Sequence, residues 1–365
     1  MKPFHPDCGS VGKPYFSTPY CFFLKSVKQS RVGFLIVLDG KNILITGGTG
    51  SFGRAFIRSV LKQHSPARVV VFSRDELKQY EMQYTETGLN EPCMRYFIGD
   101  VRDVDRLETA MRGIDYVIHA AALKQVPTAE YNPFECIRTN VMGAENVANA
   151  AMRAGVKKVI ALSTDKAASP ANLYGASKLA SDKIFVAANN LSAANGTKFS
   201  VVRYGNVIGS RGSVVPFFQK LLRDGATEVP ITDPRMTRFW ITLNQGVEFV
   251  LTSLDMMKGG EIFVPKIPSM KITDTAESIC PGMDQKTVGI RPGEKLHEIM
   301  ITEDDARTTF ELDDRYVITP SFKGWTTEPL AGEDGIRVAE DFRYSSDTNT
   351  EWLTIEALRE MIGES

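Results

Sequence analysis

Short apolar runs alternate with longer mixed segments through the first half of the chain. From residue 41 onward, apolar runs of the kind found in buried strands occur at 43–46, 69–72, 95–98, 116–119, 159–162 and 199–203. The segments between them are long enough for helices, for example at 54–63 and 142–154. Continuous apolar strands joined by helices predict an α/β fold, with a doubly wound parallel sheet covered on both faces.

The pattern changes beyond about residue 210, where the alternation breaks up and proline, glycine and basic residues cluster. We therefore expect a first domain over 37–210 and a smaller carboxyl-terminal substrate-binding lobe over 211–365. It remains open whether strands or helices of residues 211–365 return to the first domain. The two parts would meet in a cleft at the carboxyl ends of the strands.

Residues 1–36 read as an irregular extension with scattered prolines and aromatics. The apolar run at 20–24 is too short for a signal-peptide core, and the run at 33–38 is shorter than the roughly 20 residues of a membrane span. A buried strand begins abruptly after residue 41. We expect the natural start near Val37 and no function for the extension.

Composition narrows the class of protein. The 365 residues are 43% hydrophobic and 24% charged, and the net charge of −1 gives no general attraction to nucleic acid or an anionic membrane, so neither is an expected partner. The five cysteines and four histidines are scattered, without the spacing of a disulfide framework or a metal site. We predict a reducing, cytoplasmic compartment and no metal.

The first chemical motif follows the first strand. Gly47, Gly50 and Gly53 have the spacing Gly-x-x-Gly-x-x-Gly directly before a helix. Such glycines allow a tight turn, close approach of the backbone to a pyrophosphate, and close helix–strand packing. A Rossmann-type dinucleotide-binding domain is therefore predicted.

The end of the second strand bears on the choice of cofactor. Ser73, Arg74 and Lys78 supply a hydroxyl and two cations suited to the 2′-phosphate of NADP, where an acid would favour NAD. The acids Asp75 and Glu76 in the same segment argue against a phosphate site. A helix start whose charged side chains are only solvated remains an alternative. After the third strand, Asp100 can accept from an adenine amino group or cap a helix.

A second motif follows the fifth strand. Tyr174 and Lys178 are four residues apart, so they share a helix face, where the ammonium can lower the pKa of the phenol and make Tyr174 a general base. Thr164, at the end of the strand, can hydrogen-bond the reacting hydroxyl. A packed tyrosine beside a solvated lysine is the alternative, but the preceding motifs favour catalysis.

At this point the chain resembles the extended short-chain dehydrogenase/reductases from about Lys41 to its end. It is more closely similar to the inverting UDP-N-acetylglucosamine 4,6-dehydratases of bacterial pseudaminic acid biosynthesis. The matching stretches are 73–78, 120–127, 163–168, 203–207, 209–216, 236–241 and 289–298.

The resemblance implies roles for particular residues. Asp165 would be the acid for the leaving C6 hydroxyl and Lys166 the base at C5, while Lys178 would hold the nicotinamide ribose. The implied cofactor-binding set is Gly47, Thr49, Gly50, Ser51, Phe52, Gly53, Ser73, Arg74, Asp75, Glu76, Leu77, Lys78, Asp100, Val101, Ala120, Lys124, Leu162, Ser163, Tyr174 and Lys178. The implied substrate-binding set is Lys124, Asn206, Val207, Arg211, Gly212, Ser213, Val214, Val215, Arg238, Arg291 and Glu294, of which Arg211, Arg238 and Arg291 could grip the diphosphate.

The implied chemistry raises one physical difficulty. Lys166 must be neutral to accept a proton, although a free lysine titrates near 10.4. Asp165 beside it would raise that value. Because neighbours on an extended strand point to opposite faces, we expect their interaction to be mild.

The sequence therefore predicts an NADP-dependent lyase that dehydrates UDP-N-acetylglucosamine with inversion at C5. A retaining 4,6-dehydratase or a nucleotide-sugar 4-epimerase is the alternative within the same superfamily, and a non-catalytic NADP sensor is the alternative of another class. By resemblance, a homo-oligomer is expected, either a dimer or a hexamer.

Overall fold

The computed structural model describes residues 38–192, 196–210, 212–320 and 335–363. The chain divides into two units, Met1–Leu35 and Ile36–Ser365, and every described residue belongs to the second. The prediction for residues 1–36 concerns a segment that lies outside the described residues.

The second unit is built on a ten-stranded sheet in the order β16-β14-β15-β10-β6-β5-β4-β1-β2-β3. From β10 to β3 the strands are parallel, while β15, β14 and β16 are antiparallel additions at one edge. The strands are β1 Asn42–Thr46, β2 Arg68–Ser73, β3 Met94–Ile98, β4 Tyr116–His119, β5 Lys158–Thr164, β6 Lys198–Tyr204, β10 Ile262–Pro265, β14 Thr309–Glu311, β15 Arg315–Ile318 and β16 Ile336–Arg337. The predicted α/β fold with a doubly wound parallel sheet is confirmed.

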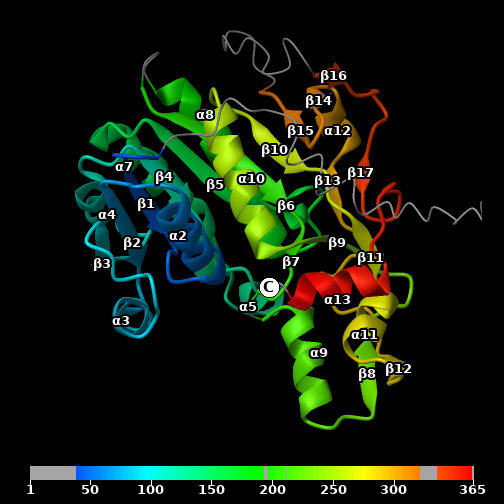
Figure 1. Cartoon of the computed structure of the whole chain (residues 1–365). Coiled ribbons are helices and arrows are strands. Elements are labelled where there is room, and N and C mark those ends of the chain that lie inside the picture. Colours follow the sequence, from blue (N-terminus) through cyan, green and yellow to red (C-terminus); the bar gives the residue numbers. More distant parts are fainter. Residues whose placement is uncertain (1–37, 193–195, 211, 321–334, 364–365) are drawn as a thin grey trace, which may run out of the picture. The chain divides into compact units, whose positions relative to one another are not determined.

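Helices cover both faces of this sheet (Figure 1). On one face α4 packs against α7 and α7 against α8, and on the other α2 packs against α10. These helices are α2 Ser51–Gln63, α4 Val104–Met111, α7 Gly143–Ala154, α8 Leu173–Leu191 and α10 Leu243–Met256. Shorter segments beside them are α3 Glu76–Tyr84, α5 Val126–Tyr131, α6 Pro133–Ile137, the π-turn η1 Arg138–Met142 and the 3₁₀ turn η2 Asp165–Ala167. The helices bury the strands on both sides, which explains why the strands read as continuous apolar runs.

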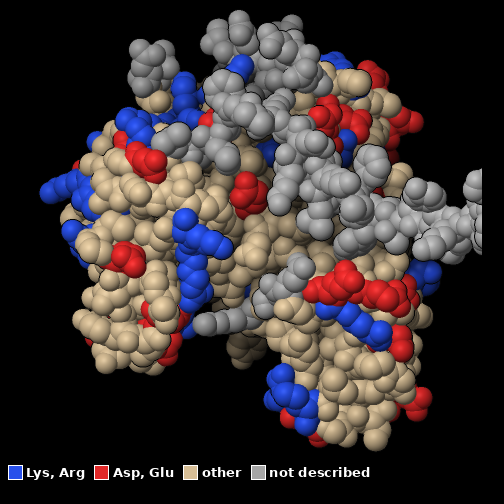
Figure 2. All heavy atoms as spheres, viewed as in Figure 1, with Lys and Arg blue, Asp and Glu red and all other residues tan. Residues whose placement is uncertain are grey.

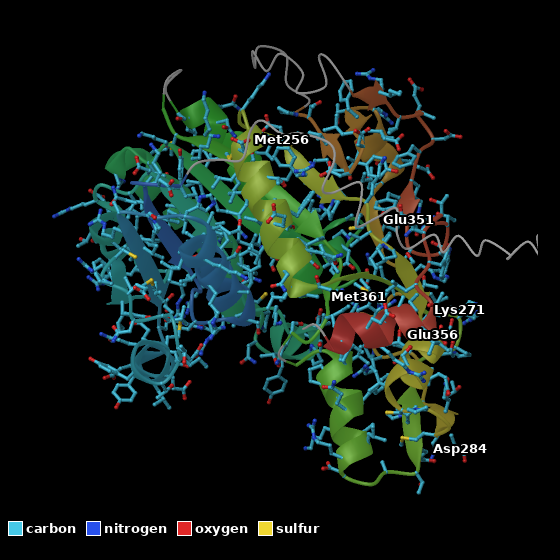
Figure 3. All side chains as sticks on the ribbon, in the orientation of Figure 1. Met256, Lys271, Asp284, Glu351, Glu356 and Met361 are labelled. Atoms are coloured by element: carbon cyan, nitrogen blue, oxygen red, sulfur yellow. The ribbon has the colours of Figure 1, made fainter. Side chains whose placement is uncertain are left out.

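A second hydrophobic cluster lies apart from the main core and includes Phe218, Trp240, Leu358 and Met361. It is formed by α9 Val214–Arg223, α11 Ile272–Ile279 and α13 Ile355–Gly363, together with β8 Glu228–Ile231, which pairs with β12 Asp284–Thr287. The pair of β13 Ile299–Ile301 and β17 Tyr344–Ser345 packs instead into the main core. A three-stranded sheet, β11 Ser269–Lys271, β9 Thr237–Ile241 and β7 Asn206–Val207, joins the second cluster to the end of β6, and α12 Glu303–Ala306 follows β13. Figure 3 shows Met361 on α13 and Asp284 on β12 in this part.

The residues after 210 divide between these two parts. Strands β10, β14, β15 and β16 extend the main sheet, whereas α9, α11 and α13 enclose the second cluster. Strand β10 is short and lies among glycines and prolines, so its apolar run did not stand out in the sequence. A domain boundary at residue 210 stays a prediction, since the chain crosses back into the sheet beyond it.

The surface of this unit mixes both signs of charge. On the face drawn in Figure 2, acidic side chains follow α13 and basic ones lie towards the end of α9. Among the helices within the described ranges, none combines the length and apolar character needed to cross a bilayer.

Candidate active site

The turn after β1 has the close packing that its glycines predict. Gly47 has φ +67°, and a Cβ there would lie 2.9 Å from Ala121 Cα, while a Cβ on Gly53 would lie 2.5 Å from Gly48 Cα. The N-cap of α2 is Gly50, which has no side chain to cap the first amides. These exposed amides at a helix start fit the pyrophosphate of a dinucleotide.

The other predicted residues of this turn lie beside it. Thr49 is buried, and its carbonyl oxygen accepts from Arg54 Nε at 3.0 Å. Ser51 and Phe52 are half-buried in the first turn of α2. Their backbone is therefore at the helix start, where a phosphate would bind.

The predicted cofactor residues after β2 have different contacts. Ser73 is buried and its hydroxyl accepts from Gln79 at 3.0 Å, while Asp75 caps α3 through the Lys78 amide and also pairs with the Lys78 ammonium. Arg74 is exposed, with Nη1 3.7 Å from Asp100 Oδ2. Lys78 is therefore engaged by Asp75, whereas Arg74 extends towards the loop after β3. Glu76 and Leu77 are exposed on α3.

The loops after β3 and β4 both lie at the carboxyl ends of the parallel strands. Asp100 accepts from the Arg102 amide at 3.0 Å, and the cap of α4 is Asp103, so the alternative of Asp100 as a helix cap does not hold. Val101 is buried, Ala120 is half-buried, and Lys124 is exposed. The loop before Lys124 is held by Asn140 of the π-turn, which exchanges two hydrogen bonds with Leu123.

Tyr174 and Lys178 are both buried on α8, as the four-residue spacing predicts. Lys178 Nζ donates to the carbonyl oxygen of Leu162 at 2.6 Å, so α8 is tied to β5. Burial raises the pKa of Tyr174 to about 12, while the charge of Lys166 and a hydrogen bond with Thr164 act in the lowering direction. The expected net lowering of this pKa is not found, because burial outweighs the lowering effects, the larger of which comes from the charge of Lys166.

The Asp165-Lys166 pair does not lie on an extended strand. Residues 165–167 form the 3₁₀ turn η2, so both side chains reach the same side, and Lys166 Nζ donates to Asp165 Oδ1 at 3.0 Å. Asp165 Oδ1 also accepts from the Thr164 hydroxyl at 2.8 Å, whereas Asp165 Oδ2 is buried without a hydrogen-bond partner among the described residues. The expected mild interaction is corrected to a direct ion pair.

Two further oxygens contact the Lys166 ammonium. Nζ lies 3.3 Å from Asn206 Oδ1 and 3.4 Å from Glu298 Oε1. Burial acts to lower the pKa of Lys166, but the charges of Asp165 and Glu298 outweigh it, so the pKa is raised above its ordinary value. The side chain of Lys166 remains 22% exposed, so it is open to a ligand.

Glu298 is a site residue that sequence reasoning missed. Its side chain is 3% exposed, and its carboxylate lies 3.9 Å from Arg238 Nε and 3.4 Å from Lys295 Nζ as well as beside Lys166. Burial raises its pKa, but the three cations reverse this and the net pKa is lowered. Glu298 ends one of the stretches that carry the family resemblance, which was the available signal, but no spacing linked it to Lys166.

A second missed carboxylate lies behind Lys178. Asp182, one helical turn further along α8, accepts from Ser163 Oγ at 2.9 Å and pairs with Arg203 Nη2 at 3.3 Å. The signal was an acid four residues after Lys178 on the same helix face. Ser163 thus donates to Asp182, while the carbonyl oxygen of Leu162 on the same strand accepts from the Lys178 ammonium.

The predicted substrate residues lie in three separate segments of the chain. Asn206 and Val207 form β7 beside β9, and Asn206 contacts Lys166 directly. Gly212 is exposed, Ser213 occupies the N-cap position of α9 without a capping hydrogen bond from its side chain, and Val214 and Val215 begin that helix. Arg211 lies outside the described residues. Arg291 is 67% exposed and pairs with Glu294 at 2.9 Å.

Arg238 has a different position from the one expected. Its side chain is nearly buried, and its two terminal nitrogens donate to carbonyl oxygens of Thr237, Lys295 and Leu296. Because these donors serve the protein, Arg238 holds the loop before β13 and is not suited to grip a diphosphate. That loop also reaches α8 and η2, since Asn172 donates to Gly293 O at 2.8 Å and Lys295 to Ala168 O at 3.0 Å.

The glycine turn, Tyr174 and Lys178 of α8, and the acid–lysine turn all lie at the carboxyl ends of the parallel strands, as the sequence resemblance to the extended short-chain dehydrogenase/reductases implies. The chain belongs to the family described as polysaccharide biosynthesis protein, whose sequence model matches residues 43–320.

Individual relatives are more specific. The chain is 58% identical to a UDP-N-acetylglucosamine 4,6-dehydratase (inverting) of Campylobacter jejuni, over 90% of this chain and 99% of that protein. It is 40% identical to a UDP-glucose 4-epimerase of Rickettsia conorii, over 88% and 95% of the two chains.

Solved structures have the same fold. Pen from Bacillus thuringiensis superposes with a TM-score of 0.81 at 37% identity, covering 90% of this chain and 98% of its own. A dTDP-glucose 4,6-dehydratase from Streptomyces venezuelae superposes with a TM-score of 0.63 at 24% identity, over 70% and 86% of the two chains. Within the described part of the chain, no group of three or more His, Cys, Asp or Glu side chains could hold a metal ion.

Proposed function

We propose that the protein is an NADP-dependent 4,6-dehydratase that converts UDP-N-acetylglucosamine, with inversion at C5, to UDP-2-acetamido-2,6-dideoxy-β-L-arabino-hex-4-ulose. This product would enter pseudaminic acid synthesis for flagellin or surface glycans. The observation that carries the proposal is the acid–lysine turn at Asp165 and Lys166, beside Tyr174, in a chain 58% identical to an inverting dehydratase.

The cofactor assignment is supported by the fit of the residues. The uncapped start of α2 suits a pyrophosphate, and the exposed guanidinium of Arg74 suits a 2′-phosphate, which favours NADP over NAD. Lys178 has one donor on Leu162 O and two more N–H groups for the nicotinamide ribose. Bound at these residues, NADP would supply reversible hydride transfer to and from the sugar.

Each proton then has a residue to carry it. Tyr174 accepts the proton of the C4 hydroxyl as a phenolate, a form that burial opposes by raising the pKa and that the charge of Lys166 favours. The C4 ketone acidifies the C5 hydrogen, which Lys166 removes as a proton, and Asp165 protonates the departing C6 hydroxyl. Inversion follows if the C5 position is reprotonated from the face opposite to that of the substrate hydrogen.

The substrate assignment is tested by product analysis. The purified protein is incubated with NADP and a set of UDP sugars, and the products are followed by proton NMR. We expect UDP-N-acetylglucosamine to give the 4-keto-6-deoxy product with inverted C5, and an unchanged C5 configuration would contradict the proposal. Lys166→Ala should keep cofactor binding and abolish elimination, whereas full turnover by this variant would exclude Lys166 as the base.

A 4-epimerase is the second candidate, because the Rickettsia relative carries that name. An epimerase has no need of an acid and a base for elimination, so a 4-epimerase reaction would not explain the Asp165-Lys166 pair. The same NMR experiment separates the two, since an epimerase would give the C4 epimer without loss of water.

The proposal extends to partners and compartment. We infer a cytoplasmic homo-oligomer, a dimer or a hexamer, without nucleic-acid or membrane partners. Exposed apolar side chains on α5 and α6, among them Tyr131 and Phe134, are consistent with burial against another copy. Light scattering on the full chain tests the association, and a monomer at micromolar concentration would contradict it.

A further inference from the structure

The surroundings of Lys166 define its protonation state by geometry. Its Nζ faces three oxygens within hydrogen-bonding or ion-pair distance, on Asp165, Asn206 and Glu298. An ammonium group has three N–H donors for three such acceptors, whereas a neutral amine would direct a lone pair at one of them. The arrangement therefore suits the charged form.

The charged and titratable groups around Lys166 come from several elements. Asp165 lies on η2, Glu298 directly precedes β13, Arg238 lies on β9 and Tyr174 on α8. Arg238 opposes the positive charge of Lys166, while the two carboxylates favour it and together outweigh Arg238 and burial.

We propose that Glu298 is a positioning residue for Lys166, which together with Asp165 holds it as an ammonium in the resting protein, and that this stored proton passes to Asp165 to begin the elimination. The inference deepens the proposed function and rests on it for the roles of Asp165 and Lys166. Glu298 contacts Lys166 and not the reacting atoms.

The proton count of this scheme closes. In the first step the N–H bond of the Lys166 ammonium breaks and an O–H bond forms on Asp165, leaving a neutral amine and a carboxylic acid. The amine then takes the C5 proton, and the electron pair of the C5–H bond forms the C5=C6 double bond as the C6–O bond breaks. The leaving hydroxyl takes the Asp165 proton and departs as water. Lys166 is again an ammonium and Asp165 again a carboxylate, so the resting state is restored.

Asp165 and not Glu298 is the acceptor in this scheme for two reasons. Asp165 Oδ1 is hydrogen-bonded to Lys166 Nζ at 3.0 Å, whereas Glu298 Oε1 is 3.4 Å away. Glu298 also contacts Arg238 and Lys295, and these two further cations stabilise its anion. A carboxylate shared by three cations is a poor proton acceptor but a good anchor.

The charge state of Lys166 can be measured without substrate. Full-length protein is labelled with acetic anhydride over a range of pH, and the labelling of Lys166 is quantified by peptide mass spectrometry against exposed Lys62. Because only the neutral amine reacts, the pH of half-maximal labelling reports protonation. We expect Glu298→Gln to lower this midpoint by about one unit, which is a tenfold gain in labelling at a fixed pH below it. Glu298→Asp, which keeps the charge, should lie close to the unmodified protein.

A matched control is Glu261→Gln. Glu261 is also a buried carboxylate, which accepts from Ser200 and the Gly259 amide, away from the site. It should lower thermal stability without moving the Lys166 midpoint. An unchanged midpoint in folded Glu298→Gln, judged by its melting transition, would overturn the inference.

The same variants are then assayed for product formation against pH. We expect the alkaline limb of kcat, where the stored proton of Lys166 is lost, to move to lower pH in Glu298→Gln by the same interval as the labelling midpoint, and to stay in place in Glu261→Gln. An unmoved limb together with a shifted midpoint would exclude the stored proton from the reaction. If no variant or parent dehydrates UDP-N-acetylglucosamine while the labelling midpoint still shifts, the proposed function fails but the holding of Lys166 by Glu298 stands.

Discussion

Gly175 on α8 packs directly against the backbone carbonyl of Lys166, so that a Cβ at Gly175 would lie 2.2 Å from the Lys166 oxygen. The same Cβ would lie 3.1 Å from Pro170 Cβ. Only a residue without a side chain allows α8 to approach the turn this closely. The contact therefore sets the distance between the turn with Asp165 and Lys166 and the helix with Tyr174.

Gly175→Ala is expected to push this turn away from α8. We expect a destabilisation of about 1–3 kcal/mol, because the added methyl group meets backbone that cannot yield, and a fall in kcat with little change in cofactor affinity. Denaturant unfolding and steady-state kinetics measure the two effects. The matched control is Gly246→Ala in α10, where a Cβ would meet nothing within 4 Å. That variant should be neutral or slightly stabilising, and equal losses in both variants would argue against the contact.

Buried His119 predicts a dependence of stability on pH. Its Nδ1 is 2.8 Å from Thr46 Oγ1, and burial, with the charge of Lys178, lowers its pKa to about 3. An unfolded histidine titrates near 6.5, so the folded state favours the neutral ring and its stability is lost as pH falls below that value. We expect a loss of up to about 1.4 kcal/mol per pH unit between pH 6 and 5 in urea unfolding. His119→Gln should flatten this part of the curve, and an identical slope in the variant would refute the assignment.

Arg74 predicts the preference between the two dinucleotides. Arg74→Ala should weaken NADP binding by about tenfold or more, since a charge-assisted contact to a phosphate is worth about 1.5–3 kcal/mol, and leave NAD binding nearly unchanged. Titration of the purified variant with each cofactor by calorimetry checks this. The control is Arg95, an exposed cation near the amino end of β3. Arg95→Ala should alter neither the NADP nor the NAD affinity. Equal weakening of NADP and NAD would point to a structural role for Arg74.

Ser346 supports Glu298 from the backbone side. Its hydroxyl accepts from the Glu298 amide at 2.9 Å and lies 2.7 Å from the Thr237 hydroxyl. Ser346→Ala leaves the buried Glu298 N–H without its acceptor, so we expect a loss of about 1–3 kcal/mol in unfolding free energy. The Ser278 hydroxyl on α11 donates to Asp274 O, in the preceding turn of its own helix. Ser278→Ala should cost under about 0.5 kcal/mol. Comparable losses would contradict the special position of Ser346.

Sequence reasoning worked where the chemistry is local. The glycine spacing at 47–53 and the four-residue spacing of Tyr174 and Lys178 each fit within one turn and one helix, so periodicity alone placed them correctly. It failed where a side chain's partner comes from a distant element. Nothing near Lys166 in the sequence indicated that Glu298 would neutralise it, and nothing near Arg238 indicated that its donors would serve the loop 289–298.

The turn at Asp165 shows a second limit. An extended strand and a 3₁₀ turn differ by a few backbone angles at one residue, yet the first separates neighbouring side chains and the second brings them together. The residues that decide between them are Thr164, whose hydroxyl accepts from the Lys166 amide, and distant Gly175, whose missing side chain leaves room for the turn.

The pairing of β13 with β17 has a consequence for the order in which the enzyme is made. Ser345 and Ser346 hold the backbone of Glu298, and a ribosome releases them after every other part of the site. A growing chain therefore completes its proton-handling centre only near the end of synthesis. Activity is expected to appear only when translation has passed these two serines.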